Sequence, residues 1–174
     1  AAALAARDDV ELVVAADLRV GEPRDGVVAA RLDVTDAATI APLLRRHRID
    51  TVVHLAAIVN PGRDVGQEYR VDVTGAANVL AACVDAGVRR IVVSSSGAAY
   101  GYHADDPEWI DEDQPLRGND AFPYARHKRL VEEHLAAHRR EHPELEQVVF
   151  RIGTILGPRV RNQNTAHWDG KRLL

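Results

Sequence analysis

The chain has 174 residues, enough for one well-packed domain and too few for two, and 46% hydrophobic with 28% charged residues is an ordinary globular composition. Its formal charge of −4 and its lack of a basic cluster argue against a nucleic-acid-binding surface. No run of apolar residues approaches the roughly 18 that a membrane-spanning helix needs, so no membrane span is predicted. The single cysteine, Cys83, excludes an internal disulfide, and the first residues lack the basic segment of a signal peptide, so we expect a cytoplasmic protein.

Apolar strand patterns alternate with amphipathic helix patterns along the whole sequence. After the end of a helix at 1–7, we expect strands at 11–16 and 27–32, a helix at 36–47, a strand at 51–55, a helix at 71–86, a strand at 90–93 running into 94–96, a helix at 124–140 and a strand at 147–152. Asp36 stands at a helix N-cap position, and Gly87 follows a helix where a left-handed cap costs little. A loop over about 97–123 is rich in acidic residues, glycine and proline.

Strands joined by single helices imply right-handed crossovers, and therefore an α/β fold with a mostly parallel sheet covered on both faces. In such sheets, ligands bind beyond the carboxyl ends of the strands. The candidate site residues are therefore those that directly follow each strand.

Acidic residues follow the first two expected strands. Asp17 can accept hydrogen bonds from the hydroxyls of an adenosine ribose and would repel a 2′-phosphate, which favours NAD over NADP; a strand-ending turn explains it equally well. Arg19 could pair with that phosphate and keeps NADP as the less favoured cofactor. Asp33 with Val34 is a candidate cradle for the adenine, although a helix-capping role also explains Asp33.

The next two strands end in small and hydroxyl-bearing residues. Ala56 and Ala57 would let a dinucleotide backbone approach closely, and His54, inside an apolar strand, is interpreted as a packed core histidine. The three serines at 94–96 could hydrogen-bond a substrate alcohol or carbonyl, and a simple turn explains them as well.

Tyr124 and Lys128 form the strongest local pattern. Residues four apart on a helix share a face about 5–6 Å apart. A free tyrosine has a pKa near 10, and an ammonium within about 4–6 Å favours the ionised form; about 4 kcal/mol of stabilisation would bring it near neutrality. Of the 22 lysines and arginines, only Lys128 and Lys171 are lysines, so a lysine kept here is expected to be required. Tyr124 is therefore the candidate proton carrier for a hydride transfer.

These segments resemble the extended short-chain dehydrogenase/reductase superfamily, in particular its NAD-dependent epimerase/dehydratase family. The resemblance rests on Asp17, Asp33 with Val34, HLAA at 54–57, VDVTGAANVL at 71–80, SSSGAAYG at 94–101, PYARHK at 123–128 and RIGTILGP at 151–158, in the family's order and spacing. It implies a Rossmann-type doubly wound sheet, bound NAD and a Ser–Tyr–Lys catalytic set. Ser96 would orient the substrate, Tyr124 would be the general acid/base, and Lys128 would bind the nicotinamide ribose and tune the tyrosine. Further implied cofactor residues are Leu18, Leu55, Ala56, Ala57, Ser94, Ile152 and Gly153, and implied substrate residues are Thr154 and Asn162.

The sequence departs from the family in several places. The opening strand and the Gly-rich TGxxGxxG turn have no counterpart here, and neither does the C-terminal substrate lobe. We therefore expect a fragment or an incompletely represented protein, with 1–158 forming an incomplete NAD-binding domain and 159–174 beginning the substrate-binding region. Asp72 stands where the family more often has Asn. Thr154 stands where many sugar-nucleotide members of the family have Asn. Gly97 and Ala98 replace the Asp–Glu pair of the sugar-nucleotide 4,6-dehydratases, so dehydration is not expected.

The expected function is that of an NAD-dependent epimerase or dehydrogenase acting on a secondary alcohol, in the first place that of a nucleotide sugar, with a small-molecule substrate and no metal. The alternatives are an NAD(P)-dependent reductase or hydroxysteroid-type dehydrogenase, and, from another class, a non-catalytic dinucleotide sensor, which would not need both Tyr124 and Lys128. A homodimer is left open.

Two polar segments remain for the substrate side. The acidic loop at 105–113 is expected to be a solvated surface loop that Trp109 and Ile110 pin to the body of the protein, with substrate contact as the alternative. The stretch 162–164 could bind a diphosphate or a sugar.

Overall fold

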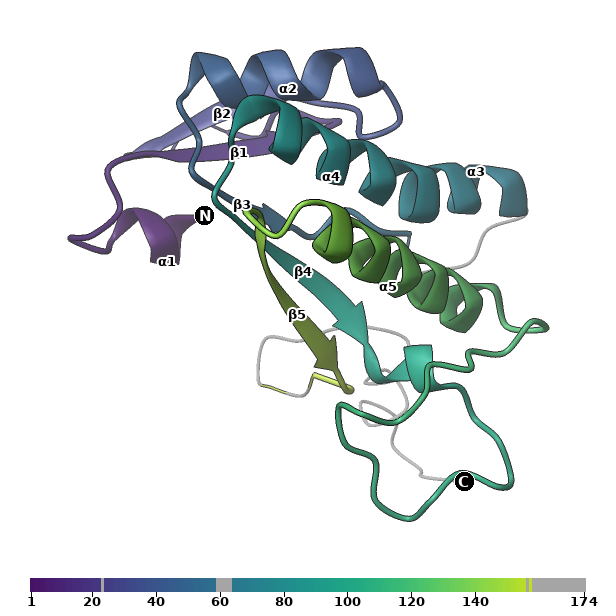
Figure 1. Cartoon of the computed structure of the whole chain (residues 1–174). Helices are drawn as coiled ribbons and strands as arrows, with labels where there is room; N and C mark the ends of the chain where they lie inside the picture. Colours follow the sequence, from purple (N-terminus) through teal and green to yellow (C-terminus); the bar gives the residue numbers. More distant parts are fainter. Residues whose placement is uncertain (23, 59–63, 156, 158–174) are drawn as a thin grey trace, which may run out of the picture.

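The computed structural model describes residues 1–22, 24–58, 64–155 and 157. Within these residues, five strands pair in two parallel sheets (Figure 1). One sheet joins β1 (Val13–Asp17) to β2 (Val27–Arg31), and the other has the order β3 (Thr51–His54), β4 (Arg90–Ser96), β5 (Glu146–Ile152). The register sets His54 opposite Val93 and Ser96 opposite Ile152, so the carboxyl ends of β3, β4 and β5 lie at one edge. The predicted α/β class with parallel strands is confirmed.

The helices follow the predicted alternation, with one difference at the third long segment. The elements are α1 (Ala2–Ala5), α2 (Ala37–Arg46), α3 (Val65–Tyr69), a π-helical turn η1 (Arg70–Thr74), α4 (Gly75–Ala86), a 3₁₀ turn η2 (Gly97–Tyr100) and α5 (Pro123–Glu141). The helix predicted from residue 71 instead begins at Val65, because the side chain of Asp64 caps it by accepting the backbone N–H of Gln67 at 2.8 Å. Gly87 ends α4 with φ 71°, as predicted.

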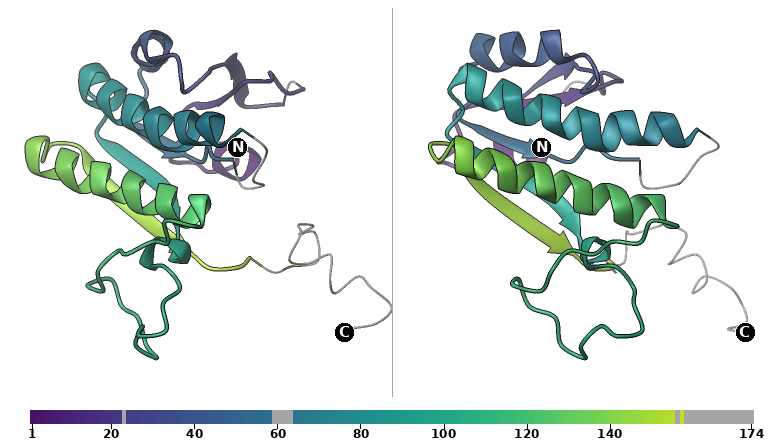
Figure 2. Two further views of the ribbon diagram at one scale, coloured as in Figure 1. Left: turned by 90° about the vertical axis from the view of Figure 1, so that its right-hand side faces the viewer. Right: turned by 45° about the vertical axis from the view of Figure 1, so that its right-hand side comes forward.

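Helices α2, α4 and α5 lie side by side in one layer over the strands (Figures 1 and 2). Their apolar sides bury a core centred on Ile40, Leu80, Ile91 and Leu135, each almost fully inaccessible. Strand side chains turned away from this core, such as Val53 and Phe150, are 43% and 55% exposed. Within the described residues these three helices cover one face of the strands, and helix cover on the other face stays a prediction.

The loop that follows η2 is held by polar contacts. Tyr100 Oη donates to the Asp111 carbonyl at 2.8 Å, Arg117 binds Asp105 at 3.0 Å, and His103 Nε2 meets the Gly118 carbonyl at 2.7 Å.

The prediction that Trp109 and Ile110 pin this loop is wrong, since they are 85% and 41% exposed. The polar contacts of the loop leave its apolar side chains at the surface. No helix within the described residues is long and apolar enough to cross a membrane.

Candidate active site

Helix α5 presents the two residues of the strongest sequence pattern. Pro123 occupies its first turn, where a fixed φ and a missing N–H cost nothing. One turn later, Lys128 Nζ donates to the carbonyl oxygen of Ser94 at 2.8 Å and lies 5.6 Å from the centre of the Tyr124 ring. The predicted i to i+4 pair therefore exists, and the end of β4 fixes its lysine.

The surroundings of Lys128 act on its charge in opposite directions. Burial lowers the pKa of Lys128, whereas the carboxylates of Asp72 and Glu132 favour its ammonium form. His54 is 8% exposed, which confirms it as a packed histidine, and burial together with the charge of Lys128 lowers the pKa of His54 to about 4. Near neutral pH the imidazole is therefore uncharged beside the lysine.

The three serines end β4 as strand residues, so they are not the simple turn that was the alternative. Successive side chains of a strand point to opposite faces, so Ser94 and Ser96 share one face and Ser95 takes the other. Ser96 Oγ accepts the N–H of Ala98 at 3.2 Å and caps η2, which packs against α5. Its own hydroxyl proton remains available to donate to a substrate oxygen.

Ser95 belongs to a buried network that sequence reasoning missed. Its hydroxyl donates to Glu132 at 2.5 Å, and Arg151 donates to the same carboxylate from Nε at 2.9 Å and from Nη2 at 2.8 Å. Arg151 Nη1 also donates to Tyr100 Oη at 2.6 Å, and the hydrogen bond to Glu132 raises the pKa of Arg151. The network ties β4, α5, β5 and η2 together. The i+4 spacing of Glu132 from Lys128 was visible in the sequence, but nothing local pointed to the burial of Glu132.

A second group of predicted residues surrounds the carboxyl ends of β1 and β2. Leu18 and Asp33 line a small cavity of ≈ 140 Å³, whose other walls are Thr35, Gln67, Arg70 and Val71. Asp33 accepts the N–H of Thr35 at 2.9 Å and its hydroxyl at 2.7 Å, which lowers the pKa of Asp33. The alternative that Asp33 caps a helix is wrong, because the N-cap residue of α2 is Asp36. The side chain of Asp36 itself makes no capping hydrogen bond.

Asp17 lies at the end of β1 in an exposed position. One of its carboxylate oxygens accepts the N–H of Arg19 at 3.0 Å, which is the turn that the sequence left as an alternative. Val34 is held by Asn78, whose Nδ2 donates to the Val34 carbonyl at 2.9 Å.

The remaining predicted residues lie at the ends of β3 and β5. Leu55 and Ala56 are exposed and Ala57 is half-buried after β3; Ile152, Gly153 and Thr154 are exposed at and after the end of β5. The register places Ile152 beside Ser96. Asn162, the stretch 162–164 and the region predicted to begin at 159 lie outside the described residues.

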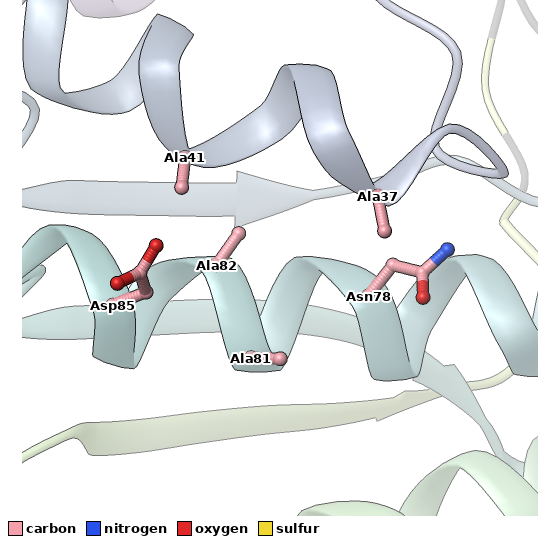
Figure 3. Close-up of a pocket in the computed structure, with 6 residues that line it drawn as sticks. All are labelled: Ala37, Ala41, Asn78, Ala81, Ala82 and Asp85. Atoms are coloured by element: carbon pink, nitrogen blue, oxygen red, sulfur yellow. The ribbon is translucent and has the colours of Figure 1, made fainter.

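The larger cavity, of ≈ 300 Å³, lies elsewhere, between α2 and α4 (Figure 3). It is lined by alanine methyl groups, Asn78 and Asp85, and none of the predicted site residues that the structure describes lines it. Since ligands of parallel sheets bind at the carboxyl ends of strands, this cavity between two helices is not the candidate active site.

The chain is similar to known proteins in sequence and in fold. The model of the NAD-dependent epimerase/dehydratase family matches residues 1–171. A UDP-glucose 4-epimerase from Rhizobium leguminosarum bv. trifolii is 31% identical over 128 residues, which are 72% of this chain and 38% of the relative. The crystal structure of a UDP-glucose 4-epimerase from Thermus thermophilus with NAD matches with a TM-score of 0.71 and 29% identity, over 84% of this chain and 49% of that one. MoeE5 in complex with UDP-glucose and NAD matches with a TM-score of 0.71 and 32% identity, over 86% and 48%. The chain thus spans less than half the length of each of these proteins.

Proposed function

The chain belongs to the NAD-dependent epimerase/dehydratase family, and from this premise we propose that it carries the cofactor side and the Ser96–Tyr124–Lys128 set of an NAD-dependent epimerase acting on a nucleotide sugar. The observation that carries the proposal is the Tyr124–Lys128 pair on α5, with the lysine anchored to the Ser94 carbonyl at 2.8 Å. That anchor uses one of the three ammonium donors of Lys128 and leaves two for a ribose. The bound cofactor in the Thermus and MoeE5 structures supports NAD as the dinucleotide.

The residues present fit a dinucleotide along the ends of the strands. Leu18 and Asp33 border the small cavity on the adenosine side, and Arg70 in its wall supplies a positive charge for a phosphate. After β3, Ala56 and Ala57 carry only methyl groups, so a cofactor backbone can approach the main chain closely. Lys128 then stands at the nicotinamide end, beyond β4.

Within this proposal, the residues of the chain handle the proton. NAD, when bound, supplies the carbon that takes up the hydride. Tyr124 accepts the proton of the reacting hydroxyl, and the ammonium of Lys128 stabilises the phenolate that does so. Ser96 donates its hydroxyl hydrogen to the substrate oxygen, since its own oxygen is already engaged by the N–H of Ala98. Returning the proton from Tyr124 completes the cycle after the hydride has come back to the other face of the sugar.

Dehydration is disfavoured by the turn that follows Ser96. Gly97 and Ala98 are the first two residues of η2, and Ala98 is 3% exposed, so no carboxylate stands there to remove and return protons. A dehydrogenase or reductase that releases its reduced cofactor uses the same three residues and is the second candidate. The non-catalytic sensor is disfavoured because it has no use for a lysine held beside a tyrosine.

The test uses the complete gene product incubated with UDP-glucose, followed by NMR of the sugar and by the absorbance of reduced nicotinamide. Appearance of the C4 epimer without accumulation of reduced cofactor supports the epimerase. Accumulation of reduced cofactor in proportion to oxidised sugar identifies the dehydrogenase instead. If neither the epimer nor reduced cofactor appears, with UDP-glucose or with other nucleotide sugars, the proposed substrate class is contradicted.

Cofactor choice is tested by calorimetric titration with NAD and NADP. The charge of Asp17 predicts tighter binding of NAD, and Asp17→Asn is expected to narrow the difference. Asp25→Asn, an exposed acid in the turn before β2, is the matched control and should leave the ratio unchanged. Tighter binding of NADP by the unmodified protein would mean that Arg19 dominates.

A further inference from the structure

A buried histidine–aspartate pair includes His127, the residue directly before Lys128 on α5, and has no part in the proposed reaction. His127 Nδ1 and Asp72 Oδ2 are 3.2 Å apart, and the two side chains are 1% and 7% exposed. The ring of Tyr69 meets the imidazole edge-on, with centres 5.7 Å apart. Because a carboxylate can only accept, Nδ1 carries the hydrogen of this contact, and within the described residues Nε2 has no hydrogen-bond partner.

The second oxygen of the same carboxylate reaches a different element. Asp72 Oδ1 accepts the backbone N–H of Ile58 at 2.7 Å, and Ile58 follows residues 55–57, the proposed cofactor wall after β3. His127 is the residue directly before Lys128 on α5. One carboxylate therefore joins the cofactor wall to the catalytic helix, across 14 and 55 positions of sequence.

Asp72 reaches both partners from the π-helical turn η1. Such a turn inserts an extra residue into a helix and changes the direction of the side chains around it, and π turns occur often at functional sites. The turn packs against α5, which brings Asp72 to His127.

Asp72 is also one of two carboxylates that act on Lys128. The groups around the ammonium are Asp72 from η1, Glu132 and Tyr124 from α5, His54 from β3 and the Ser94 carbonyl from β4. Glu132 is already countered by Arg151 of β5. Among the described residues, Asp72 is paired with a histidine and a backbone N–H, and no lysine or arginine forms an ion pair with it.

We propose that Asp72 is a positioning residue that fixes the cofactor wall relative to α5 and keeps Lys128 in its ammonium form. The inference rests on the proposed role of Lys128 in catalysis. Where the family more often has Asn at this position, an amide can make the same two contacts but brings no charge. The aspartate thus adds an electrostatic task to a structural one.

The variant Asp72→Asn separates the two tasks. Its amide oxygen can still accept the Ile58 N–H, and its amide nitrogen can donate to His127 Nδ1 once the imidazole proton moves to Nε2. The contacts are kept and the negative charge is lost. Asp85→Asn, the same change at an exposed position of α4 that pairs with Arg45, is the matched control.

The experiment titrates Lys128 by NMR in the complete gene product labelled with [ε-¹³C]lysine, with Lys128→Arg used to assign the resonance. We expect Asp72→Asn to lower the titration midpoint of Lys128 by about 1 pH unit, the smaller end of what a nearby carboxylate causes. Asp85→Asn should leave the midpoint where it is in the unmodified protein. Equal midpoints in all three proteins would overturn the proposal.

A second variant keeps the test decisive if Asp72→Asn does not fold. His127→Gln keeps the carboxylate, so the midpoint of Lys128 should stay within a few tenths of a unit or rise; a fall by about 1 unit would overturn the proposal, because the charge of Asp72 is still present. Neither titration needs substrate or cofactor. The titration result therefore holds even if the proposed reaction is wrong. Unchanged midpoints of Lys128, in turn, would not contradict the proposed reaction.

Discussion

Replacing Glu132 by alanine should cost the fold far more than the same change one residue later. Glu132 is 6% exposed and accepts hydrogen bonds from Arg151 and Ser95, whereas Glu133 is 52% exposed and pairs with Arg129 one turn away. Glu132→Ala leaves the guanidinium of Arg151 without its counter-charge and the buried Ser95 hydroxyl without an acceptor. Breaking a buried pair costs about 3–5 kcal/mol, while an exposed i, i+4 pair contributes about 0.3–0.5 kcal/mol.

The assay is urea unfolding of the complete gene product and of both variants, followed by circular dichroism at pH 7.5. We expect Glu132→Ala to lower the free energy of unfolding by about 3–5 kcal/mol and Glu133→Ala by no more than about 0.5 kcal/mol. A loss below about 1 kcal/mol for Glu132→Ala, or equal losses for the two variants, would refute the stabilising role of this network.

Three further predictions concern buried groups and the loop. The pKa of His54 is near 6.5 in the unfolded chain and about 4 in the folded protein, so between these pH values only the unfolded chain binds the proton. The free energy of unfolding should therefore fall as the pH drops through this window, by about 1.4 kcal/mol per pH unit from this residue. His54→Gln should reduce that slope in denaturation curves, and an unchanged slope would contradict the burial of His54. Burial raises the pKa of the Cys83 thiol to about 12, so the native protein should not react with a thiol reagent at pH 8 until it is denatured; rapid native reaction would contradict the core. Gly101 has φ 93°, and an added Cβ would lie 2.5 Å from the Gly118 carbonyl oxygen, so Gly101→Ala should lower the free energy of unfolding by at least about 2 kcal/mol in the same assay, whereas a neutral effect would mean that the loop adapts.

Sequence reasoning succeeded where the physical cause is local. Strand and helix periodicity predicted the parallel α/β arrangement, and helical spacing brought Tyr124 and Lys128 together. The start of the helix at Val65 was missed, because it depends on the capping Asp64 and on a π-helical turn that periodicity does not reveal.

The charged groups behind the site could not be predicted in the same way. His127 lies in the polar run Arg126 to Arg129, and its burial depends on packing against η1, 55 residues away along the chain. Glu132 and Arg151 are residue types that usually lie at the surface, and only their mutual pairing permits burial. For Trp109 the error was the opposite one: a large apolar side chain was predicted to be packed and is exposed, because polar contacts hold its loop.

Turnover by Tyr124→Phe, with NAD affinity titrated in the same preparation, decides whether Tyr124 carries the proton of the reaction. We expect turnover to fall by about 10²–10⁴-fold, the usual contribution of a general acid/base, while the dissociation constant for NAD changes little. Tyr102→Phe removes a hydroxyl from an exposed tyrosine beyond Phe122 and should leave both values unchanged. Turnover by Tyr124→Phe equal to that of the unmodified protein would contradict the catalytic role of the Tyr124–Lys128 pair.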